Sequence, residues 1–138
     1  MGIRTKNLHH HIITLRSAGT LTAASDKDVA KALFDGFITN IVGKVTSGGT
    51  GSTNTIVDVN LNGTTLFSTA TKMTFASTTG IASYSPLSNE PVSVTYGSMF
   101  TLDVDSVALA PKNLVVQITV SKNQMEAAGN NENQAEVL

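Results

Sequence analysis

Apolar and polar residues alternate along most of this chain, in short runs that are separated by Gly, Ser or Asn. Successive side chains of a strand point to opposite faces, so a period of two is typical of a half-buried strand. The clearest runs span residues 10–17, 36–47, 55–61, 98–107 and 113–122, and a shorter one spans 71–78. Together they predict an all-β fold.

In the runs 10–17, 36–47, 98–107 and 113–122 apolar residues share one face, and in the last two runs this face is predicted to point inward. The residues on those faces are Ile13 and Leu15; Phe37, Ile41 and Val45; Phe100, Leu102 and Val104; and Leu114, Val116, Ile118 and Val120. The run 36–47 also starts with an apolar residue, Ile38, on its other face. That strand is therefore predicted to lie in the interior of a sheet.

A β-hairpin is predicted with unusual clarity in the stretch TIVDVNLNGTTLFST, residues 55–69. Asn62-Gly63 is the dipeptide that a type I′ turn prefers, because both central residues take positive φ. This turn pairs Leu61 with Thr64, Val59 with Leu66 and Val57 with Ser68, and it places Asp58, Asn60 and Asn62 on the outer face or in the turn. The stretch is thus predicted to be scaffold.

One stretch departs from the strand pattern. In SDKDVAKALF, residues 25–34, Ser25 can cap a helix with Asp28 three residues later, and Gly36 can end it. Val29, Ala32 and Leu33 have helical spacing. The stretch predicts one short helix near residues 26–34, with an extended connector as the alternative.

About eight short strands at regular spacing predict a jelly-roll-like β-sandwich that spans residues 12–122. An exposed, mobile loop is predicted at 47–54, which is rich in Gly and Ser. A second loop is predicted at 80–91, where Pro86 and Pro91 disfavour central strand positions. Residues 1–11 are predicted to form an N-terminal arm. Residues 123–138, which are polar and rich in Asn, are predicted to form a flexible tail.

Composition excludes several classes of protein. The chain has 138 residues, a formal net charge of −1 and no Cys, so it has no disulfide, thiolate metal site or Cys nucleophile. Its lysines are scattered, which predicts no interface with nucleic acid. No apolar run approaches the roughly 20 residues that span a bilayer, and no signal peptide is recognisable. The chain is expected to be made in the cytoplasm and not to bind a membrane.

The only histidines are His9, His10 and His11. His9 and His11 share one side of a strand start and could offer two imidazoles to a metal. Two ligands do not make a site, so the expected interpretation is exposed side chains at the start of a strand.

Two pairs of aspartates, each separated by one residue, are candidates for a catalytic or calcium-binding site. Asp103 with Asp105, and Asp26 with Asp28, could act as acid and base or collect Ca²⁺. Outward carboxylates on a half-solvated strand are the ordinary alternative. Because no nucleophile, acid and base converge, the sequence predicts no enzyme, no catalytic residues, no metal and no cofactor.

The order of motifs resembles a recurrent β-sandwich module of tailed-bacteriophage structural proteins. The similar pieces are LFDGFITNIVGKV, TIVDVNLNGTTLFS, GSMFTLDVDSVA and NLVVQITV, within residues 12–121. Leu33-Phe34 and the tail after Lys122 depart from the module and are candidate contacts with a neighbour. The resemblance implies a jelly-roll-like sandwich and a component of the virion, and it carries over no catalytic residues.

The resemblance favours a capsid decoration (cement) protein, a homotrimer on the outer capsid surface that bridges major capsid protein subunits. Trimer contacts are expected on sheet edges and near Leu87, and capsid contacts on residues 1–11. The alternative is a tail-fibre or receptor-binding module whose loops 47–54 and 80–91 recognise a host surface glycan. The only tyrosines, Tyr84 and Tyr96, lie in or near the second loop.

Overall fold

The computed structural model describes residues 10–68, 72–77, 82–84 and 92–122. In this part of the chain every regular element is a strand, and no helix is present that is long and apolar enough to cross a membrane. The strands are β1 (His10–Thr20), β2 (Ala24–Lys31), β3 (Gly36–Ser47), β4 (Thr55–Leu61), β5 (Thr64–Thr65), β6 (Met73–Phe75), β7 (Ala82–Tyr84), β8 (Val92–Val94), β9 (Met99–Ser106) and β10 (Lys112–Ser121).

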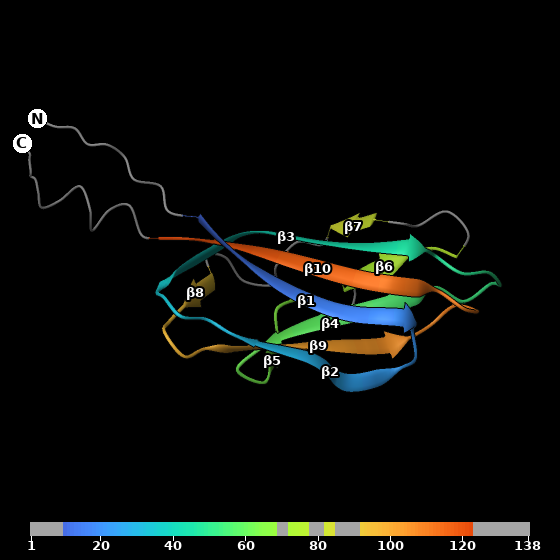
Figure 1. Ribbon diagram of the computed structural model, residues 1–138, viewed down its shortest axis with the longest axis horizontal. Helices are drawn as coiled ribbons and strands as arrows, with labels where there is room; N and C mark the ends of the chain where they lie inside the picture. Colours follow the sequence, from blue (N-terminus) through green and yellow to red (C-terminus); the bar gives the residue numbers. More distant parts are fainter. Residues whose placement is uncertain (1–9, 69–71, 78–81, 85–91, 123–138) are drawn as a thin grey trace, which may run out of the picture.

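The strands form two antiparallel sheets that pack face to face (Figure 1). One sheet has the order β1-β10-β3-β7, with β8 also paired to β3, and we call it sheet A. The other, sheet B, has the order β2-β9-β4-β5, with β6 also paired to β4. Strands β1 to β4 alternate between the two sheets, and β9 and β10 again lie in different sheets, whereas β4 and β9 are neighbours in sheet B. Two sheets whose strands cross over in this way are typical of a jelly roll. The predicted jelly-roll-like sandwich is therefore confirmed.

The short strands explain how ten segments fill eight strand positions. Strands β7 and β8 pair with residues 42–44 and 36–38 of β3, respectively. Strands β5 and β6 likewise pair with residues 60–61 and 55–57 of β4. Each pair of short strands thus serves as one interrupted edge strand.

The predicted hairpin forms, but it is shorter than expected. Asn62 and Gly63 have φ of 51° and 86°, Leu61 pairs with Thr64, and the Leu66 N–H donates to the Val59 carbonyl at 2.9 Å. The expected pairing of Val57 with Ser68 is wrong, because β6 takes that place and pairs Met73 with Val57. Burial of Met73 and Phe75 in the core accounts for this replacement.

The predicted helix near residues 26–34 is wrong, because most of this stretch is the edge strand β2. It pairs with β9, and it carries two extra residues between Ala24 and Asp28, where Asp26 has φ of 53°. The apolar residues with helical spacing do not share a buried face, since Ala32 is buried whereas Val29 and Leu33 are exposed. Pairing with the buried strand β9 has overridden local helix propensity.

A bulge in β3 corrects the predicted faces of this strand. Asn40 pairs with Thr119 and Ile38 with Val120, which leaves Thr39 as an extra residue. An extra residue reverses the alternation. Ile38 therefore points into the core with Ile41, and Phe37 is only partly buried.

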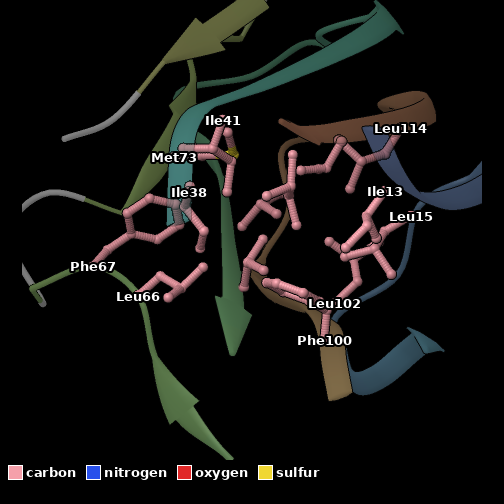
Figure 2. Packing of buried hydrophobic residues seen from close by; sticks show 14 of the residues in the cluster. Ile13, Leu15, Ile38, Ile41, Leu66, Phe67, Met73, Phe100, Leu102 and Leu114 are labelled. Carbon is pink, nitrogen blue, oxygen red and sulfur yellow. The ribbon is translucent and has the colours of Figure 1, made fainter. Parts of the chain in front are cut away.

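Apolar side chains from both sheets fill the space between them (Figure 2). The predicted inward residues of β9 and β10 are all buried, and so are Ile13 and Leu15, which are predicted to share one face of β1. Gly43 is one place where a small residue is required, because an added Cβ would lie 3.0 Å from Phe75 Cζ and 3.1 Å from Met73 Sδ. The missing side chain in β3 makes room for large residues of β6.

The chain enters and leaves the sandwich at one end. His10, at the start of β1, pairs with Ser121, at the end of β10. Residues 1–9 of the predicted arm, the predicted tail 123–138, and Pro86, Leu87 and Pro91 lie outside the described residues. We call the end of the sandwich that holds His10 and Ser121 the terminal end.

Candidate functional site

The outer face of sheet B carries a cluster of two carboxylates around one lysine. Asp58 is 5 % exposed, and its carboxylate accepts a hydrogen bond from the Thr65 hydroxyl and lies 3.3 Å from Lys72 Nζ. Lys72 Nζ also lies 2.7 Å from the carboxylate of Asp105. One ammonium group thus bridges a buried and an exposed carboxylate.

The pKa of Lys72 is raised above its ordinary value of 10.5. The main cause is the hydrogen bond to Asp105, and the nearby charge of Asp58 adds to it, whereas partial burial of the ammonium opposes the rise. Lys72 is therefore held in its charged form. Sequence reasoning missed this role because the residue looked like one of several scattered lysines.

Asp103 has partners of its own. Its carboxylate accepts from Asn60 Nδ2 at 2.7 Å and from the Asp26 N–H at 2.8 Å. Asp103 and Asp105 both point outward, as predicted, but they bind different donors. The Asp103 carboxylate therefore fixes the extra residues of β2 onto sheet B.

The other predicted pair, Asp26 and Asp28, is also divided. Asp28 Oδ2 accepts the Arg16 N–H at 2.7 Å, which joins the edge of sheet A to the edge of sheet B. Among the described residues no three His, Cys, Asp or Glu side chains are grouped so that they could hold a metal ion. The carboxylates of Asp28 and Asp103 thus each connect neighbouring strands.

The histidines take separate places at the terminal end. His10 Nδ1 lies 2.7 Å from the Ser121 hydroxyl, which in turn lies 3.4 Å from the Thr39 hydroxyl. The His11 ring stacks on Phe34, with ring centroids 3.9 Å apart. His9 is outside the described residues. His10 and His11 thus contact strand ends and a loop, and they do not converge.

Three exposed apolar residues gather at the terminal end. Leu33 is 65 %, Tyr96 70 % and Met99 39 % exposed, and we call these three residues the end patch. Leu33 lies in the loop between β2 and β3, whereas Tyr96 and Met99 lie in and just after the turn between β8 and β9. The departure of Leu33-Phe34 from the phage module pointed to part of this surface.

Hydrogen bonds hold the two segments of the end patch side by side. The Ala32 N–H donates to the Ser98 carbonyl and the Gly97 N–H to the Ala32 carbonyl, both at 2.8 Å. The Tyr96 N–H donates to Asp35 Oδ1 at 2.7 Å. The patch therefore sits on a backbone that is fixed before any partner binds.

The opposite end of the sandwich carries the first of the predicted recognition loops. Thr50 and Leu109 exchange backbone hydrogen bonds of 2.8 and 2.9 Å, and Gly48 and Gly49 are buried. The interpretation of residues 47–54 as a wholly exposed loop is therefore wrong for these two glycines. Leu109, which is 68 % exposed, is a large apolar residue at this end.

No model of a known protein family matches the chain, and no curated protein matches it either.

Proposed function

We propose that this protein is a structural component of a tailed-bacteriophage virion, namely a capsid decoration (cement) protein that stabilises the head by bridging major capsid protein subunits. The observation that carries the proposal is the arrangement of residues at the terminal end. There the chain passes from residues 1–9 into β1, beside a fixed apolar surface and away from every cluster of charged side chains described on sheet B.

The polar residues of the phage-like motifs support a structural role. The Asp35 carboxylate of the LFDG motif accepts a hydrogen bond from the Tyr96 N–H. Asn62 and Gly63 form the hairpin turn. The Asp58 carboxylate forms an ion pair with Lys72 and accepts a hydrogen bond from the Thr65 hydroxyl. Each of them contributes to the stability of the sandwich. A protein that braces a shell requires such a stable body, with contacts at its ends.

In this proposal residues 1–11 contact the capsid. Several copies held together bring several arms to the shell at once, and each further contact then forms at a high effective concentration. A contact that is weak for one copy therefore gives the whole assembly a high affinity for the capsid. The protein is proposed to work on the outer capsid surface as a homotrimer, without nucleic acid or membrane.

The test uses the purified full chain with expanded, empty capsids of the phage that encodes it, and in parallel with host cells. We expect saturable, stoichiometric binding to capsids and a higher melting temperature of the decorated capsids. Deletion of residues 2–9 should abolish binding while the urea-unfolding midpoint of the sandwich stays unchanged. Binding to cells without binding to capsids would overturn the proposal in favour of a receptor-binding module.

A further inference from the structure

The end patch brings exposed apolar side chains from two segments of the chain to one end of the sandwich. Leu33 and Tyr96 are among its most exposed large apolar side chains, yet the backbone beneath them is fixed by hydrogen bonds between two loops. Flexible loops would lose entropy on binding, whereas this surface is already ordered. Fixed, exposed apolar and aromatic side chains are typical of the centre of a protein–protein interface.

Charged residues flank the patch in a way that selects its partner. Lys31 lies directly opposite Met99 where β2 pairs with β9, and the Asp35 carboxylate accepts the Tyr96 N–H at 2.7 Å, so a cation and a carboxylate border the patch. In the part of the chain that the structure describes, neither Lys31 nor Asp35 forms an ion pair. A surface with one charge of each sign around an apolar centre is complementary to a rotated copy of itself.

We propose that the end patch binds the end patch of a second copy of this chain around a rotation axis. Leu33, Tyr96 and Met99 of the copies meet near the axis, and Lys31 of each copy faces Asp35 of the next. A rotation axis repeats this contact until the assembly closes, which limits its size. The inference rests on the proposed function only for the number of copies, which is three.

This arrangement also accounts for the position of the chain ends. His11 stacks on Phe34, the residue after Leu33, so β1 begins beside the patch. Copies joined through their patches bring residues 1–9 together around one axis. The assembly would then present all its arms to one partner surface, as the capsid contact requires.

The first experiment measures the mass of the full chain in solution across micromolar concentrations, by sedimentation velocity and native mass spectrometry. We expect a closed oligomer, and we expect Leu33→Ser to raise its dissociation constant at least about tenfold. The matched control is Leu109→Ser, which removes an equally exposed leucine at the other end of the sandwich. It should leave the mass unchanged, and urea unfolding should show that both variants fold.

The second experiment tests the charge pairing. Lys31→Glu should weaken the oligomer, because it places a carboxylate opposite Asp35, and added salt should recover part of the loss by screening this repulsion. Lys31→Gln, which only removes the positive charge, should weaken the oligomer less. Equal effects of these two variants in the folded chain would overturn the pairing. A monomeric wild-type chain, or an oligomer that only Leu109→Ser weakens, would overturn the inference as a whole.

The experiments distinguish a failure of the proposed oligomer contact from a failure of the proposed capsid function. An oligomer that depends on Leu33 but leaves capsids undecorated would refute the capsid function and support the inference. A monomer that decorates capsids would do the reverse.

Discussion

Asp58 and Asp103 lie directly opposite each other on β4 and β9, with both side chains on the outer face of sheet B. Like charges in this position normally destabilise a sheet. Here each carboxylate has different donors, namely Lys72 and Thr65 for Asp58, and Asn60 and the Asp26 backbone for Asp103. The stability of this sheet therefore depends on specific partners, and this dependence can be measured.

Lys72→Met should destabilise the protein. The substitution leaves the buried Asp58 carboxylate without its cation, which we expect to lower the free energy of unfolding by about 2 kcal/mol. Urea unfolding at pH 7 measures the change. The control is Lys44→Met, which removes a lysine that forms no ion pair among the described residues and should change the free energy by less than about 0.5 kcal/mol. Equal effects of the two variants would contradict the assigned role of Lys72.

The contribution of Lys72 should depend on alkaline pH. Because its pKa is higher in the folded protein than the ordinary value of 10.5, protonation favours the folded state. The stabilisation should be complete below pH 10.5 and should be lost as the pH rises through the folded-state pKa. Measured from pH 8 to 11.5, the difference in unfolding free energy between wild type and Lys72→Met should therefore be constant below pH 10.5 and should shrink as the pH is raised above it. A constant difference across this range would show that the ammonium charge is not the cause.

Gly43→Val should destabilise the core. The added side chain collides with Phe75 and Met73, and overpacking of this kind costs about 1–3 kcal/mol. In a Phe75→Leu background the collision is relieved, so the same substitution should cost less. A double-mutant cycle of unfolding free energies tests this coupling. Additive effects would mean that Gly43 and Phe75 do not share the space as described.

Asp28→Ala should loosen the edge of sheet A at Arg16. The carboxylate from β2 is the acceptor of the Arg16 N–H, so its removal should accelerate hydrogen exchange at that amide. Amide exchange followed by NMR reads this out residue by residue. Lys31→Ala, on the same strand, is the control and should leave the Arg16 amide protected. Unchanged exchange in Asp28→Ala would show that another group protects the edge.

The sequence by itself determined those features that depend on short-range pattern. The alternation in β9 and β10 fixes which side chains are buried, and Asn62-Gly63 forms the hairpin turn because both residues tolerate positive φ. These relations involve neighbours along the chain. They therefore survive in the sequence as a readable period or dipeptide.

Only the tertiary structure decided the rest. Pairing with β9 turned a helical pattern into strand β2, and an extra residue at Thr39 brought Ile38 into the core. Lys72 forms ion pairs with Asp58 and Asp105 because folding brings segments together that are far apart in the sequence. For the same reason the loop that contains Leu33 is hydrogen-bonded to the turn that contains Tyr96. Such contacts depend on how much apolar surface each pairing buries across the whole domain, a quantity that no local pattern contains.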